Sequence, residues 1–315
     1  MSKNGEFFGR TLDLEFSLDE KVVVIPRNFD FKFRYTKNLN SHYAIIGMAT
    51  IKNAYPLLYD ATNEYGLSIA ALNFPQNAVY SQKSDFKPNV AVFEFIPFIL
   101  GSCKTVGEAV KLIENIYIIG EDFDENLKTT PLHWLISDKK SSITVEPLKS
   151  GVEIYKNSVG VLTNNPPFDY HLTNLSNYMS LSAESPENNF SKELNLTKYS
   201  RGMGALGLPG DNSSASRFIR AAFFKYNALP FENNGVELFF RIMSGVEQTK
   251  GIVRLSSGEN VISVYTSCCD TENGIYYYKT YGGGFGAVYL HNCDLDSKNI
   301  FAFNLERQPK IHISN

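Results

Sequence analysis

Cysteine and histidine are scarce in this sequence: its 315 residues include four cysteines and five histidines. Four cysteines do not make the disulfide framework typical of small secreted proteins. The sequence has no C-x-x-C pair, and the adjacent Cys268 and Cys269 have no ligand-type partners near them in the sequence. Cys103 and Cys293 are interpreted as small apolar residues. We therefore expect structural cysteines and no metal site.

Long apolar runs are also missing. The longest, residues 90–100, is broken by Glu94 and Pro97 and is too short to span a bilayer. The start of the sequence lacks a basic segment followed by an apolar one, so no secretory signal is predicted and a cytoplasmic location is favoured. The net charge of -3 gives no electrostatic reason to expect nucleic acid or an anionic membrane as partner.

Several common catalytic motifs are absent as well. The sequence contains no G-x-S-x-G elbow, no P-loop and no H-E-x-x-H metal motif. His133, which precedes Trp134 in a predicted strand, is interpreted as a hydrogen-bonded core residue, and His171 as a structural residue of a helix. The glycine run 282–284 is interpreted as a tight turn, because no helix start clearly follows it.

The sequence is rich in short β-forming runs separated by turn residues. Their succession in meanders, with a few helices in blocks, favours an α+β layered fold over alternating βαβ units. No repeat or linker is visible, so residues 1–315 are predicted to form one domain, with the polar stretch 182–198 as a surface loop. The predicted strands are residues 6–13, 21–25, 42–51, 57–60, 67–72, 133–137, 143–147, 152–155, 159–163, 261–266, 275–280, 285–290 and 300–303.

Helices are fewer but well marked. Thr105 and Glu108 form a capping-box pattern, in which the threonine hydroxyl accepts from a backbone amide and the glutamate reaches back. Apolar residues recur at helical spacing from Val106 to Tyr117. Further amphipathic helices are predicted over residues 168–181, 214–224 and 236–248.

Five polar residues occupy unusual places. Arg10 and Asp13 lie on or just after an apolar strand. Asn73 and Asn164 each end an apolar run, and Arg217 enters a helix whose next residues are apolar. Each alone has a structural interpretation, as a turn former or half of a salt bridge. Together they suit an amide hydrolase, because side-chain amides can donate to an oxyanion and cations can lower the pKa of a nucleophile. The residues alone do not supply that nucleophile.

Five segments, in this order along the chain, carry a family resemblance: FFGRTLDLEFS, PLLYDATNEYGLSIAALNFP, TPLHWLISDKKSSITVE, VGVLTNNPPFDY and GLPGDNSSASRFIRAAF. The sequence resembles the choloylglycine hydrolase family of conjugated bile salt hydrolases and penicillin V acylases, from about Gly5 to the C-terminus. It is most similar to bile salt hydrolases of Gram-positive gut bacteria. The resemblance implies the N-terminal nucleophile hydrolase fold, a four-layer αββα sandwich of two antiparallel sheets, and no metal or cofactor.

The nucleophile of that family is a cysteine at the extreme N-terminus, which begins a strand that pairs with the strand of the F-G-R motif. Asn4-Gly5 is a strong hairpin-turn signal, yet only Met1, Ser2 and Lys3 precede it. The sequence therefore departs from the family at the nucleophile strand. Three explanations are open: a natural N-terminus longer than this sequence, an inactive relative, or, least favoured, Ser2 as nucleophile.

The resemblance also assigns roles to the five polar residues. Asp13 would hold the α-amine of the missing cysteine, and Arg10 would favour its thiolate. Asn73 and Asn164 would form the oxyanion hole, and Arg217 would complete the charged shell.

The implied activity is cleavage of conjugated bile salts to free bile acid and glycine or taurine, by a homotetramer. A steroid is a rigid apolar slab, so its site should be apolar and aromatic with few polar groups. The candidate wall residues are Phe16, Tyr55, Leu57, Phe123, Ala205 and Leu206. Two alternatives stay open: a penicillin V acylase, and a catalytically inactive relative that binds bile salts.

Overall fold

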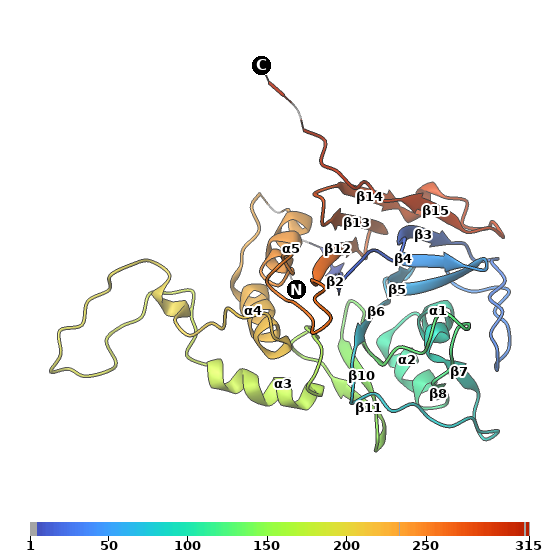
Figure 1. The fold of residues 1–315 in the computed structure, drawn as a ribbon, viewed down its shortest axis with the longest axis horizontal. Helices are drawn as coiled ribbons and strands as arrows, with labels where there is room; N and C mark the ends of the chain where they lie inside the picture. Colours follow the sequence, from blue (N-terminus) through green and yellow to red (C-terminus); the bar gives the residue numbers. More distant parts are fainter. Residues whose placement is uncertain (1–4, 233, 312, 315) are drawn as a thin grey trace.

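The computed structural model describes residues 5–232, 234–311 and 313–314 (Figure 1). Its larger sheet has eight antiparallel strands in the order β11-β10-β9-β6-β5-β4-β3-β15. These strands span Lys21–Ile25 (β3), Ile45–Lys52 (β4), Tyr55–Asn63 (β5), Ser68–Asn73 (β6), Leu132–Ser137 (β9), Ser142–Leu148 (β10), Gly151–Lys156 (β11) and Phe301–Asn304 (β15).

The smaller sheet is built around the long strand β12, and it too is antiparallel. β12 pairs with β13, which pairs with β14, while the short strands β1 and β2 both pair with β12. A separate parallel pair is formed by β7 and β8. These strands span Phe7–Phe8 (β1), Thr11–Leu14 (β2), Asn89–Ala91 (β7), Tyr117–Ile119 (β8), Ile262–Asp270 (β12), Ile275–Thr280 (β13) and Phe285–Tyr289 (β14).

Helices cover the outer faces of the two sheets (Figure 1). α1 packs on β5 and β6 of the larger sheet, and α5 packs on β12 and β1 of the smaller one. α4 contacts both α3 and α5. The helices span Phe95–Ser102 (α1), Val106–Ile113 (α2), Phe168–Leu175 (α3), Ser214–Asn227 (α4) and Gly235–Ser244 (α5). The structure thus has the predicted four layers, αββα.

Strand β3 shows how the sequence produces this stacking. Val22 and Val24 belong to the apolar cluster between the two sheets, whereas Val23 and Ile25 belong to the cluster under α1 and α2. Alternate residues of a strand point to opposite faces, so a strand buried on both faces is apolar throughout. The run Lys21–Ile25 therefore lies in the middle of the sandwich.

Two predicted strands differ in the structure: the strand expected over residues 6–13 is broken into β1 and β2, and the one expected over residues 159–163 is absent. Residues 159–163 form no strand, because side chains bond their backbone groups. Asn157 accepts from the Gly160 amide at 2.7 Å and donates to the Val161 carbonyl at 2.9 Å, and Lys225 donates to the Val159 carbonyl at 2.7 Å. Such local side-chain bonds compete with a sheet ladder. The apolar residues Val159 and Leu162 are instead buried in the cluster that contains residues of α3 and α4.

Helix boundaries also differ from the prediction. The helix expected over residues 168–181 ends at Leu175 and continues as a 3-10 turn, Ser176–Tyr178. Helix α1 was not predicted from the sequence, because nearly all of its residues are buried and no amphipathic period marks it. Thr105 caps α2 as predicted, accepting from the Glu108 amide at 3.2 Å, but Glu108 itself accepts from the amide of Lys104.

The polar stretch 182–198 is an exposed loop, as predicted, and it projects from the body of the molecule (Figure 1). Among the described residues, no helix has the length and hydrophobicity that a membrane span requires.

Candidate active site

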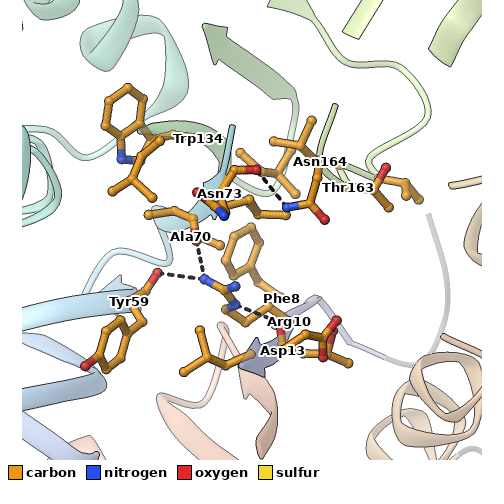
Figure 2. Close-up of a pocket in the computed structure, with 18 of the residues that line it drawn as sticks. Phe8, Arg10, Asp13, Tyr59, Ala70, Asn73, Trp134, Thr163 and Asn164 are labelled. Atoms are coloured by element: carbon orange, nitrogen blue, oxygen red, sulfur yellow. Dashed lines mark hydrogen bonds between the residues drawn. The ribbon is translucent and has the colours of Figure 1, made fainter. Parts of the chain in front are cut away.

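A cavity of about 1550 Å³ lies between the elements that carry the five polar residues singled out in the sequence. Its lining includes Arg10, Asp13, Asn73, Asn164 and Arg217. Figure 2 shows Arg10 and Asp13 close to the Asn73–Asn164 pair. The fold therefore brings together residues that are separated by up to 207 positions in the sequence.

Arg10 connects the two sheets. Its guanidinium donates to the carbonyls of Tyr59 and Ala71, which belong to neighbouring strands of the larger sheet, and its Nε donates to the carbonyl of Thr11 at 2.9 Å (Figure 2). Gly9 makes this position possible, because a Cβ there would lie only 2.0 Å from the carbonyl oxygen of Ser267 in β12. The F-G-R motif thus seats the arginine between the sheets.

Asp13 lies on β2 and is held by hydroxyl groups. Its Oδ1 accepts from Ser263 at 2.5 Å and its Oδ2 from Thr11 at 3.2 Å, and the guanidinium of Arg217 is 3.9 Å from Oδ2. Burial raises the pKa of this carboxyl, and the charges of Arg217 and Arg10 oppose that rise.

Asn164 has a fixed amide orientation. Its Oδ1 accepts from Nη2 of Arg217 at 2.6 Å, so its Nδ2 must be the atom that donates to the Asn73 carbonyl, at 2.7 Å (Figure 2). Burial lowers the pKa of Arg217, although the carboxyl of Asp13 acts in the opposite direction. Arg217 therefore lies between the carboxyl of Asp13 and the amide of Asn164.

Sequence reasoning missed Asp60, a buried acid next to the site. It is 1% exposed and accepts from the hydroxyls of Tyr265 (2.6 Å), Tyr276 (2.6 Å) and Ser267 (2.9 Å). Ser267 in turn accepts from the backbone amide of Arg10 at 3.2 Å. Burial raises the pKa of Asp60, and the charge of Arg10 opposes this. The available sequence signal was the one charged residue of β5.

The predicted wall residues divide into two groups. Leu57 and Phe123 line the cavity, while Phe16, Tyr55, Ala205 and Leu206 are not among its lining residues. Phe16 is 58% exposed and Leu206 is 61% exposed. Tyr55 lies one layer behind the cavity wall, because its ring packs on Phe93 and Phe123, both of which line the cavity.

None of the chain's four cysteines lines the cavity. Burial raises the pKa of each thiol, to about 12 for Cys103 and Cys269, so these groups are poor nucleophiles at neutral pH. The predicted turn at Asn4 and the alternative nucleophile Ser2 lie outside the described residues. Within the described residues, no group of three or more His, Cys, Asp or Glu side chains could hold a metal ion.

The arrangement suits stabilisation of negative charge. Two guanidinium groups and a side-chain amide face the cavity, and hydrogen bonds fix their directions before any ligand arrives. Preorganised donors of this kind stabilise an oxyanion or a thiolate more effectively than mobile water does.

Comparison with known proteins agrees with this geometry. The family model of the linear amide C-N hydrolases, choloylglycine hydrolase family, matches residues 2–303. A "Bile salt hydrolase/transferase" of Lactiplantibacillus plantarum is 46% identical over 312 residues, which cover 98% of this chain and 96% of that protein. The crystal structure of a mutant conjugated bile acid hydrolase from Clostridium perfringens superimposes with a TM-score of 0.91 at 36% identity, over 99% of this chain and 97% of the other.

A more distant likeness concerns the fold alone. The penicillin V acylase of Agrobacterium tumefaciens has a TM-score of 0.77 at 18% identity, over 98% of this chain and 91% of that one. The architecture is accordingly that of the N-terminal nucleophile hydrolases, with two antiparallel sheets between helical layers. The chain belongs to the choloylglycine hydrolase family of linear amide C-N hydrolases.

Proposed function

We propose that this protein hydrolyses the amide bond of glycine- or taurine-conjugated bile salts. The observation that carries the proposal is the cluster of Arg10, Asn164 and Arg217 in a large, mostly apolar cavity, in a chain that shares 46% identity with a protein named bile salt hydrolase. A steroid with an anionic conjugate needs this combination of apolar wall and sparse polar groups.

The proposed chemistry needs a thiolate from an N-terminal cysteine, as the family resemblance implies. The sulfur attacks the amide carbonyl, the C–N bond breaks, and glycine or taurine leaves with a proton from the cysteine's own α-amine. Water then cleaves the thioester, releasing the bile acid and restoring the thiol. A free α-amine titrates near ~7.7–8.0, so it can accept and return this proton at neutral pH.

In this scheme the described residues support the nucleophile and the oxyanion. Asp13 orients the α-amine, and Arg10 favours the thiolate. Asn164 and the segment at Asn73 donate to the oxyanion. Arg217 fixes the orientation of the Asn164 amide. The homotetramer and the cytoplasmic location stay predictions from the sequence.

The test compares two proteins: the 315-residue chain, and the same chain extended at its N-terminus by one strand that begins with cysteine. Release of glycine or taurine is measured from glycocholate and taurocholate, with penicillin V as a parallel substrate. We expect the extended chain to hydrolyse the bile salts faster than penicillin V.

Each other outcome selects an alternative. Preference for penicillin V would favour the acylase, and bile-salt binding without turnover by both chains would favour a non-catalytic binding protein. Turnover by the 315-residue chain that is lost on Ser2→Ala would make Ser2 the nucleophile.

A further inference from the structure

A buried acid–base pair lies behind the two asparagines of the candidate site. His133 of β9 and Glu146 of β10 are both fully buried, and neither lines the cavity. Nδ1 of His133 is 3.0 Å from Oε1 of Glu146. A buried ion pair repays its desolvation poorly, and apolar residues of similar volume often stabilise a fold as well or better. A contribution to stability therefore does not by itself explain why this pair is buried here.

Hydrogen bonding fixes where the histidine's proton lies. Nε2 of His133 is 2.8 Å from the carbonyl oxygen of Thr163, which can only accept, so Nε2 carries a hydrogen. The other ring nitrogen, Nδ1, faces the carboxyl group of Glu146. The carboxylate also accepts from the backbone amide of Phe168, at the start of α3, at 3.1 and 3.2 Å. Each polar atom of the pair thus has a specific partner.

The partners of His133 adjoin both asparagines. Thr163 directly precedes Asn164, and Phe74 directly follows Asn73. The ring of Phe74 stacks on the His133 ring, with centroids 4.2 Å apart and an interplanar angle of 5°. One side chain therefore contacts the neighbours of both oxyanion residues.

A second histidine holds the other side of Asn164. Nε2 of His171, on α3, donates to the Asn164 carbonyl at 3.0 Å. Because Glu146 binds the start of α3, the pair also fixes the helix that carries His171. The backbone on both sides of the Asn164 side chain is thereby tied to the same buried pair.

We infer that the His133–Glu146 pair is a positioning device that sets the spacing between Asn164 and Asn73. This inference rests on the proposed function, since the two asparagines are its oxyanion residues. Misplacing a reacting group by about 1 Å can cost roughly 10²-fold in rate, so a small relaxation of either segment should be visible in kcat.

The test uses whichever of the two chains above turns over a conjugated bile salt. His133→Phe keeps the stacked ring but removes the donor to Thr163, and it leaves Glu146 as an unpaired buried charge. The variant is therefore made together with Glu146→Gln, so that failure to fold does not obscure the result. We expect the double variant to lose roughly 10- to 100-fold in kcat with little change in KM. Its crystal structure should show the Asn164 Nδ2–Asn73 O distance longer than 2.7 Å.

Glu146→Gln alone is the conservative comparison. Its amide can donate to Nδ1 of a neutral His133 while its oxygen still accepts from Phe168, so it should retain more kcat than the double variant. His42→Phe is the matched control: His42 is also buried, lies near backbone carbonyls and packs on Phe31, but its neighbours Phe29 and Tyr43 do not adjoin either asparagine.

An unmoved Asn164 with wild-type kcat in the double variant would overturn the inference, as would an equal loss of kcat in His42→Phe. If neither chain hydrolyses any substrate, the proposed function fails. The crystal structures of the variant and its parent then still decide whether the pair positions Asn164.

Discussion

At the scale of single residues, the direction of one amide group decides what the site can do. The guanidinium of Arg217 can only donate, so it holds Oδ1 of Asn164 and turns Nδ2 toward Asn73. One hydrogen of that Nδ2 bonds the Asn73 carbonyl, and the amide has a second hydrogen to offer. A neutral amide is a suitable oxyanion donor, because it needs no change of protonation during the reaction.

Asn164→Ala should therefore lower kcat by roughly 10²–10³, the usual effect of removing one oxyanion donor. The measurement is steady-state release of glycine from glycocholate by the cysteine-extended chain. Asn28→Ala is the control, since the Asn28 side chain makes a similar 2.8 Å bond to a backbone carbonyl but does not line the cavity. A folded Asn164→Ala protein with unchanged kcat would contradict the oxyanion role.

At the scale of elements, the site depends on how β1 and β2 join β12. β1 pairs with residues 269–270 of β12, and β2 pairs with residues 262–266. The break between the two strands lies at Gly9 and Arg10, and at Gly9 the backbone approaches Ser267 so closely that a side chain would not fit. This break directs Arg10 toward the larger sheet.

Gly9→Ala tests that arrangement. The nearest atoms to the new Cβ are backbone atoms of Ser267 and Cys268, which cannot rotate away, so the β1–β2 segment must shift. We expect a loss of about 1–3 kcal/mol in the free energy of unfolding, measured as a lower urea midpoint. Gly210→Ala, where the added Cβ meets nothing within 4 Å, should leave the midpoint nearly unchanged. Equal midpoints for Gly9→Ala and wild type would show that the contact is not tight.

The sequence predicted elements well where periodicity or capping was visible and poorly where they were not. α4 begins at Ser214, as expected, whereas α1 is uniformly apolar and gave no period. Residues 159–163 have the composition of a strand, but the side chains of Asn157, Lys225 and His133 bond their backbone groups. Such contacts form only in the folded protein, so the amino-acid composition of the segment does not predict them.

The candidate site was predicted in the same uneven way. Arg10, Asp13, Asn73, Asn164 and Arg217 all line one cavity. The contacts of Arg10 with Ser267, and of Ser267 with Asp60, could not be predicted because they depend on which strands become neighbours. The wall residues Phe16, Ala205 and Leu206 were chosen as loop positions, and loop positions are set by contacts that sequence patterns do not describe.

At the scale of the whole molecule, two buried histidines make stability depend on pH. His42 lies against Phe31 in the cluster of the larger sheet, and His171 stacks on Phe218 between α3 and α4. Burial lowers the pKa of both imidazoles. Backbone carbonyls and the carboxyls of Glu64, near His42, and Glu146, near His171, oppose that change.

The sign of the effect follows from proton binding. An unfolded histidine titrates near ~6.5, so below that pH the unfolded chain binds more protons than the folded one. The stability that the two neutral histidines confer is complete above about pH 6.5 and is lost as the pH falls. Asp13 and Asp60 act in the opposite sense, because burial raises their pKa values. Their contribution to the free energy of unfolding is lost as the pH rises through the acidic range.

Because these effects overlap, we predict a difference between proteins and not an absolute slope. The double variant His42→Phe with His171→Phe keeps Asp13 and Asp60 but has no imidazole at either position. From pH 7 to pH 5, the free energy of unfolding of the wild type should fall more steeply than that of the variant. The difference should be up to about 1.4 kcal/mol per pH unit for each histidine replaced. Urea unfolding at pH 5, 6 and 7 measures both slopes, and parallel slopes would mean that the two imidazoles take up protons in the folded protein as readily as in the unfolded chain.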